Sequence, residues 1–161
     1  MEQLRTWRRL NGASVKQRID DEVRAALISE KNAGHNLKLC IGTDSQVKGN
    51  LTAFATVILF VRQGMGGFMY ISKEVITRKI GISERMLTEV AKSVETANAL
   101  QGISEQYNVP IEVHADINTD PSFKSSESLN EAVGFISAMG LQFKVKPDAF
   151  ASSSCANRVV Q

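Results

Sequence analysis

Three aspartates stand at or just after the ends of predicted β-strands: Asp44, Asp116 and Asp148. We expect the strands that precede them to run parallel, which brings their carboxyl ends to one edge of the sheet, where open α/β sheets usually bind ligands. Carboxylates gathered in one crevice repel one another strongly, so such a cluster usually persists only around a divalent cation. Ligation by oxygen alone selects Mg²⁺ or Mn²⁺ over zinc. The alternative is that the three aspartates are separate, solvated residues of loops.

A glutamate from a neighbouring helix could join these aspartates. Glu84 and Glu89 lie on opposite borders of the apolar stripe of a helix that we predict to begin at Ser83. The side chain of either could therefore extend past the edge of the sheet. Each could instead be a solvated border residue, and Asp148 could instead be the N-cap of a final helix.

Polar and basic residues near the same edge are candidates for binding substrate. Ser45 and Gln46 directly follow the first aspartate and could orient substrate or water; the alternative is a polar turn. A local basic rim could hold phosphates, although surface lysines are usually only solubilising. The members of this rim are Arg78, Lys79, Lys144, Lys146 and Arg158.

Two further features have both a functional and a structural interpretation. His114 lies two residues before Asp116 and hence on the same face of its strand, so it could assist proton transfer or contact phosphate. A half-buried structural histidine is the alternative. Trp7 stands among three arginines near the N-terminus, and together they could grip nucleic acid. A docked or oligomer-forming N-terminal arm is the alternative.

The elements that must position these residues follow from changes in the period of the hydrophobic pattern. A period of two predicts strands over residues 37–44, 53–62, 68–76, 111–116 and 141–146, and a helical period predicts helices over residues 14–31, 83 to 102 or 107, 126–139 and 149–160. The first three strands form an antiparallel meander. The last two are reached through helices and should lie parallel to the first. The result is an α/β domain over residues 35–161, in the order βββαβαβα, preceded by a helical extension over residues 1–34.

The composition limits the classes of protein to which the chain can belong. Its 161 residues carry 19 lysines and arginines against 17 aspartates and glutamates, a net charge of +2, so any phosphate-binding surface must be local. Two cysteines cannot make a disulfide framework or a cysteine-rich zinc site, and without a charged-then-apolar leader we expect a cytoplasmic protein. The longest apolar run, residues 53–61, is less than half of the roughly 20 residues that span a bilayer, so we expect no membrane insertion.

Four segments of the chain carry a resemblance to a known family. They are Ile41-Gly42-Thr43-Asp44-Ser45-Gln46, Glu84-Arg85-Met86 with Glu89, His114-Ala115-Asp116-Ile117-Asn118, and Lys146-Pro147-Asp148 through Ala156-Asn157-Arg158. In this order they resemble the YkuK-like family of the ribonuclease H-like superfamily. The resemblance covers residues 37–158, and its first segment is the most specific. It implies a ribonuclease H-like fold with a five-stranded mixed sheet and helices on both faces.

The resemblance also implies a site and an activity. The site would be a two-metal centre for Mg²⁺ or Mn²⁺, in which Asp44 bridges both ions and Asp116, Asp148 and a helix glutamate complete the ligand set. For this glutamate, a catalytic residue and metal ligand, we favour Glu89, since it lies within the helix body, and keep Glu84 as the alternate. The activity would be that of a nuclease that hydrolyses phosphodiester bonds of RNA, DNA or a hybrid. The alternative is a non-catalytic module on the same scaffold that binds nucleic acid or another protein, because a fold alone does not give a function. The sequence does not indicate an oligomeric state.

Overall fold

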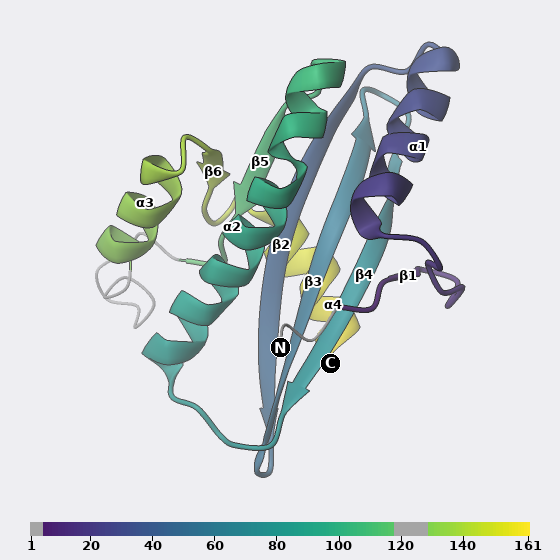
Figure 1. The fold of residues 1–161 in the computed structure, drawn as a ribbon. Coiled ribbons are helices and arrows are strands. Elements are labelled where there is room, and N and C mark those ends of the chain that lie inside the picture. Colours follow the sequence, from purple (N-terminus) through teal and green to yellow (C-terminus); the bar gives the residue numbers. More distant parts are fainter. Residues whose placement is uncertain (1–4, 118–128) are drawn as a thin grey trace.

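The computed structural model describes residues 5–117 and 129–161 of the chain (Figure 1). The elements in chain order are β1 (Arg8–Arg9), α1 (Ile19–Asn32), β2 (Leu37–Lys48), β3 (Leu51–Arg62), β4 (Gly67–Ile76), α2 (Ile82–Tyr107), β5 (Ile111–His114), α3 (Leu129–Ala138), β6 (Gln142–Lys144), the π-helical segment η2 (Ala151–Ala156) and α4 (Asn157–Val160). No helix within the two described ranges is long and apolar enough to cross a membrane.

The strands form one mixed sheet in the order β1-β4-β3-β2-β5-β6. The pairs β1–β4, β4–β3 and β3–β2 are antiparallel, whereas β2–β5 and β5–β6 are parallel. This topology confirms the predicted antiparallel meander and the predicted parallel crossovers. The sheet has six strands rather than the predicted five, because Arg8 and Arg9 of the expected helical extension pair with Ile71 and Tyr70 of β4.

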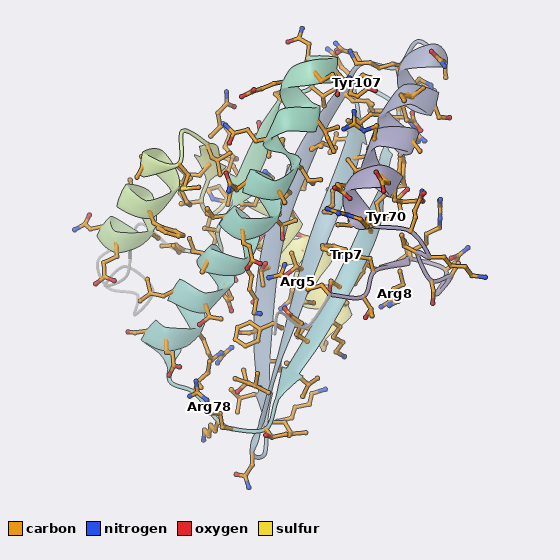
Figure 2. All side chains as sticks on the ribbon, viewed as in Figure 1. Arg5, Trp7, Arg8, Tyr70, Arg78 and Tyr107 are labelled. Atoms are coloured by element: carbon orange, nitrogen blue, oxygen red, sulfur yellow. The ribbon has the colours of Figure 1, made fainter. Side chains whose placement is uncertain are left out.

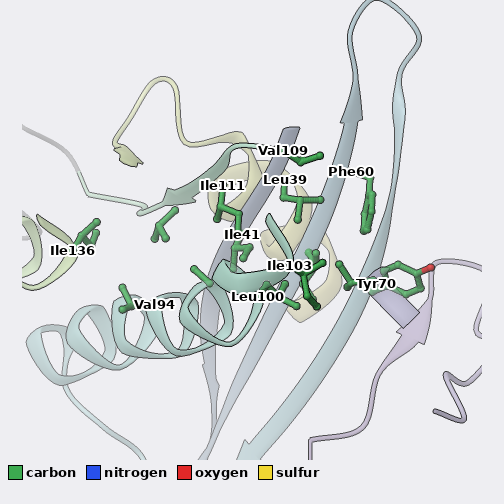
Figure 3. Close-up of a cluster of buried hydrophobic side chains, with 14 of the residues drawn as sticks. Leu39, Ile41, Phe60, Tyr70, Val94, Leu100, Ile103, Val109, Ile111 and Ile136 are labelled. Atoms are coloured by element: carbon green, nitrogen blue, oxygen red, sulfur yellow. The ribbon is translucent and has the colours of Figure 1, made fainter. Parts of the chain in front are cut away.

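The alternation of side chains along the central strands divides the core into two layers. On one face, Leu39 of β2 and Phe60 of β3 pack with residues of α1 and α2 in the larger cluster of buried apolar side chains (Figure 3). On the opposite face, Cys40 and Val57 pack against residues of η2. Figure 1 shows α1 and α2 in front of the sheet and α4 behind it. Helices therefore cover both faces, as predicted.

The start of α1 differs from the prediction because of contacts within the N-terminal segment. Ser14 forms a β-bridge with Arg8, and the N–H of Val15 donates to the carbonyl oxygen of Trp7 at 2.9 Å. These residues therefore fold back on the N-terminal strand instead of capping a helix. As a result, α1 begins at Ile19 and not at Ser14.

The N-terminal segment is docked on the sheet and on α2 (Figure 2). Trp7 is only 7% exposed and belongs to the larger core cluster. The guanidinium of Arg5 lies 3.5 Å from the carboxylate of Glu74 and 3.4 Å from that of Glu95. Residues 5–11 are therefore docked on the rest of the domain, as in the alternative to an arm that grips nucleic acid. A domain boundary between residues 34 and 35 stays a prediction.

Several element ends also move by a few residues. Helix α2 begins at Ile82 with Gly81 as its N-cap, so the predicted N-cap, Ser83, lies inside the first turn. Strand β6 spans three residues of the predicted 141–146. Residues 126–128 of the predicted third helix, and Asn118 of the family resemblance, lie outside the described residues.

The sheet places the chain after β5 beside the middle of β2. The parallel register pairs Gly42 with His114, and Asp44 and Asp116 each lie two residues further on. Backbone hydrogen bonds of 2.9 and 3.2 Å continue the pairing between the chain after β5 and the chain around β6. The two aspartates therefore come from adjacent segments of the sheet.

Gly42 allows the C-terminal turn to lie directly on β2. A Cβ atom at this position would overlap the backbone of Ala151 and Ser152, so only glycine fits without displacement. This close approach brings the first residue of α4, Asn157, to the side chain of Asp44.

Candidate active site

Asp44 is a desolvated carboxylate within β2. The residue is 6% exposed, and Nδ2 of Asn157 donates a hydrogen bond to its Oδ2 at 2.7 Å. Burial raises the pKa of Asp44, and the charge of Asp116 raises it further. The hydrogen bond from Asn157 and the charge of Arg85 act in the opposite direction. The raised pKa shows that Asp44 stands in a site that disfavours its negative charge.

Glu89 reaches the same place from α2. The residue is 4% exposed, and its Oε1 accepts a hydrogen bond from Oγ of Ser45. Burial raises the pKa of Glu89 to about 8, and the charges of Asp44 and Asp116 add to the shift. Without a cation nearby, the Glu89 carboxyl is therefore mostly protonated at neutral pH.

Glu84, the alternate, stands in different surroundings. Its side chain is 51% exposed, and its Oε1 lies 2.8 Å from Nη2 of Arg78. The structure thus brings Glu89, and not Glu84, into range of Asp44.

Asp116 is the third acid of the group. Nζ of Lys146 lies 3.0 Å from its Oδ1 but is not aligned as a donor, so this buried oxygen has no hydrogen-bond partner among the described residues. The charge of Asp116 raises the pKa of both Asp44 and Glu89, which places it within electrostatic range of both. The three acids approach one another, but their carboxylate oxygens are too far apart for one oxygen of each to lie within 4.8 Å of the other two.

Asp148, the fourth predicted ligand, lies apart from this group. It is exposed in the turn after β6, where its N–H donates to the carbonyl oxygen of Val145 at 2.8 Å. Within the described ranges, no hydrogen bond or ion pair joins it to the three converging acids. It is also not an N-cap, because the final helical segment begins at Ala151 with Phe150 as its N-cap.

Arg85 has no role predicted from the sequence, yet it is part of the site. Its Nε donates to Oγ of Ser45 at 2.9 Å, and its Nη2 donates to the backbone oxygen of the same residue at 2.9 Å. Because Oγ of Ser45 accepts a hydrogen bond from Arg85, its own proton is available for Glu89. The only sequence signal for Arg85 is its place in a segment that carries the family resemblance.

Asn157 occupies the place beside Asp44 where a fourth acid was expected. Its Oδ1 accepts a hydrogen bond from Gln161 at 2.7 Å, which leaves Nδ2 to face the Asp44 carboxylate. Asn157 also lies in one of the resembling segments, without a predicted role.

Comparisons with known proteins identify the family to which the chain belongs. The family model described as Ribonuclease H-like matches residues 21–161. The chain belongs to the ribonuclease H-like family. It is also 32% identical over 143 residues to a protein of Bacillus subtilis (strain 168) named uncharacterized protein YkuK, an alignment that covers 80% of this chain and 82% of that protein. The YkuK-like resemblance is thereby confirmed. No solved structure matches the chain significantly.

The predicted substrate contacts of this ribonuclease H-like chain lie in different surroundings. Ser45 and Lys146 are engaged by neighbouring site residues, and Arg78 pairs with an exposed glutamate. Gln46 is half-buried, and its Oε1 is a buried oxygen without a hydrogen-bond partner in the described part of the chain. All five basic members are exposed: Arg78, Lys79, Lys144, Lys146 and Arg158.

A second cluster, made of Cys40, Glu112 and His114, lies on the face that η2 covers. All three residues are buried, and one ligand atom of each lies within 4.8 Å of the other two. Nδ1 of His114 accepts a hydrogen bond from the N–H of Ala151 at 3.1 Å, so the ring proton is on Nε2, which lies 3.1 Å from Glu112. A metal ion bound to Nε2 would require the ring proton to sit on Nδ1. There it would face the N–H of Ala151, so two hydrogen-bond donors would point at each other. The cluster is therefore a structural hydrogen-bond network, and His114 is a structural histidine.

Proposed function

We propose that this ribonuclease H-like chain is a metal-dependent nuclease that hydrolyses phosphodiester bonds of RNA, DNA or a hybrid. The observation that supports it is the convergence of Asp44, Glu89 and Asp116, two of which have raised pKa values because of burial and mutual charge. Acids gathered in surroundings that disfavour their charge are typical of functional sites. On this scaffold, phosphodiester hydrolysis is the chemistry that such a group supports best.

The three acids fit Mg²⁺ or Mn²⁺ as a donor set. Every donor is a carboxylate oxygen, and Oδ1 of Asp116 is buried without a hydrogen bond. Asp44, Glu89 and Asp116 would hold the cation, and Glu89 would release its proton on binding. A bound divalent ion supplies an activated water and stabilises charge on the leaving oxygen.

Each acid has a polar partner beside it, and the partners of Asp44 and Glu89 donate hydrogen bonds that orient them. Asn157 donates to Asp44, Ser45 donates to Glu89, and the ammonium of Lys146 lies beside Asp116. Partners of this kind fix the direction of a ligand side chain and tune its basicity. The structure thus supports a site whose side chains are positioned before substrate arrives.

The remaining predicted site residues belong to the same proposal. Asp148 as a fourth ligand would have to approach from the exposed turn after β6. The basic residues would contact phosphates around the acids; they are Arg78, Lys79, Lys144 and Arg158. Such a local group can bind phosphate although the net charge of the whole chain is only +2.

The test is Mn²⁺ binding by calorimetry, followed by cleavage of labelled single-stranded RNA, single-stranded DNA and RNA–DNA hybrid. Asp44→Asn keeps the side-chain volume but removes the charge, so metal affinity and cleavage should both fall by orders of magnitude. Glu105→Gln is the matched control, because it removes an exposed acid at the far end of α2, and it should behave as wild type.

The outcomes separate the enzyme from its alternative. Unchanged cleavage by folded Asp44→Asn protein would contradict the proposed site. A wild-type protein that binds no Mn²⁺ and cleaves none of the three substrates would instead favour a non-catalytic binding module on the same scaffold.

A further inference from the structure

Lys146 places a positive charge beside one of the three acids that are proposed to hold the cation. Its Nζ lies 3.0 Å from Oδ1 of Asp116, and this buried oxygen has no hydrogen-bond partner among the described residues. Because the ammonium is not aligned as a donor, the contact is one of charge and not a hydrogen bond. A cation that binds Asp116 therefore competes with the ammonium for the same carboxylate.

The side chain of Lys146 is free to leave, although its backbone is fixed. The N–H of Lys146 donates to the carbonyl oxygen of Ile117 at 3.2 Å, which holds the backbone beside the chain after β5. The side chain is 44% exposed, so the ammonium is already close to water. An ion pair with a partner this exposed is weak, and breaking it costs little.

Arg85, another positive charge at the site, is held in a different way. Its guanidinium donates two hydrogen bonds to Ser45, one to Oγ and one to the backbone oxygen, both at 2.9 Å. A cation bound by the acids replaces neither hydrogen bond, so Arg85 keeps its place. Of these two positive charges, Lys146 is therefore the one that moves.

We propose that Lys146 is the counter-ion of the metal-free site and that a divalent cation displaces its ammonium from Asp116 on binding. The inference rests on the proposed function, because it takes Mg²⁺ or Mn²⁺ as the ion that the acids hold. Asp44 and Asp116 repel each other, so the metal-free protein gains stability from a positive charge beside them. A bound divalent ion carries the larger charge and repels the ammonium. Lys146 thus stabilises the metal-free fold and lowers the affinity for metal.

Calorimetry measures Mn²⁺ affinity, and thermal melts measure stability in EDTA and in saturating Mn²⁺. The test variant is Lys146→Met, which keeps an unbranched side chain but removes the charge, and Lys146→Gln accompanies it. Lys146→Arg keeps the charge and should bind Mn²⁺ no more tightly than wild type, since a guanidinium also pairs with a carboxylate. The matched control is Lys73→Met, which removes an exposed lysine of β4. Lys73 is in register with Ala55, the partner of Asp44, and so lies two strands from Asp44, a distance of about 10 Å.

We expect Lys146→Met to bind Mn²⁺ about 2- to 5-fold more tightly than wild type, the factor that an exposed ion pair contributes. In EDTA the variant should melt below wild type, because the acids have lost their counter-ion. Mn²⁺ should raise its melting temperature by more than that of wild type. A lysine with a structural role alone would lower both melting temperatures and leave Mn²⁺ affinity unchanged. Lys73→Met should match wild type in all three measurements.

Unchanged or weaker Mn²⁺ binding by folded Lys146→Met and Lys146→Gln proteins would overturn the inference, as would an equal gain of affinity in Lys73→Met. Failure of wild type and both Lys146 variants to bind Mn²⁺ would overturn the inference and the proposed function together. Cleavage in Mn²⁺ is scored separately. Tighter binding by the two variants without cleavage of any substrate would leave the inference standing and remove the proposed function. Cleavage by a wild type whose Mn²⁺ affinity does not depend on Lys146 would do the reverse.

Discussion

Glu84 and Glu89 lie on the same helix, yet their surroundings give them different capacities as ligands. Glu84 is half exposed and already paired with Arg78. Glu89 is buried beside two other acids, and together these disfavour its charged form more than Ser45 and Arg85 favour it, so a bound cation would be needed to keep it ionised at neutral pH. The difference comes from burial and neighbouring charge and not from the chemistry of the carboxyl group.

Glu89→Gln tests this difference at one position. The amide removes the ligand charge but can still accept a hydrogen bond from Ser45, so the fold should survive. We expect Mn²⁺ affinity to fall by at least about 10- to 100-fold, a loss that substitutions of outer partners of metal ligands already cause. Wild-type affinity should rise with pH up to about 8, because the cation competes with the Glu89 proton, and the variant should lose this dependence.

Calorimetry at pH 6, 7 and 8 measures both effects. Glu84→Gln serves as the comparison and should keep wild-type affinity and pH dependence. A loss of affinity in Glu84→Gln but not in Glu89→Gln would reverse the assignment of the helix glutamate.

At the scale of elements, local pattern predicts what lies in the middle of a strand or helix better than where it ends. Strands β2 to β5 and helix α2 follow from their periods. Ser14 has the residue type of a helix cap, but it pairs with Arg8 of a strand that is too short to show a period. The contacts of a side chain with distant elements decide such ends, and no local window contains them.

The site shows the same division between local and distant information. Asp116 was predictable because it follows a strand pattern closely. Asp44 was found by the same reasoning, but the prediction that its strand ends there was wrong, since β2 continues to Lys48 in register with β3. Arg85 and Asn157 were not predictable, because their partners in β2 lie 40 and 113 residues away in the sequence. Asp148 is placed by the turn after β6 and not by an extension of the strand, so its position just after a predicted strand did not predict where it lies.

The close contact between η2 and β2 leads to a prediction about Gly42. In Gly42→Ala the methyl group would overlap the backbone of Ala151 and Ser152, and overpacking of this kind costs about 1–3 kcal/mol. The displacement of η2 should also withdraw Asn157 from Asp44 and weaken Mn²⁺ binding. Gly102→Ala in α2 is the matched control, since its Cβ would meet nothing within 4 Å. That variant should be as stable as wild type or gain up to about 1 kcal/mol. Urea unfolding decides, and equal stability of wild type and Gly42→Ala would show that η2 does not need the glycine.

At the scale of the whole molecule, two glutamates make the stability depend on pH in opposite directions. Glu30 of α1 accepts hydrogen bonds from Nε and Nη2 of Arg62 at 2.8 and 2.7 Å, which lowers the pKa of Glu30 to about 2. Its contribution to folding is present above the unfolded pKa of 4.5 and is lost as the pH falls toward 2. Glu89 has the opposite sign, because the folded protein keeps its proton up to about pH 8 while the unfolded chain releases it near pH 4.5.

The free energy of unfolding of the metal-free protein should therefore include a term from Glu89 that falls continuously between about pH 4.5 and pH 8. Burial lowers the pKa of His114, which adds a rise with pH below 6.5, so the measured quantity is the difference between wild type and Glu89→Gln, in which that rise cancels. Urea unfolding in EDTA at pH 5, 6, 7 and 8 should show the variant gaining stability relative to wild type at each step. Repeating the series in Mn²⁺ should reduce this gain, because the cation stabilises the ionised carboxylate of wild type alone. A constant difference across the four pH values in EDTA would mean that Glu89 is already ionised in the folded protein, and the acids would then need a bound counter-charge other than a metal ion.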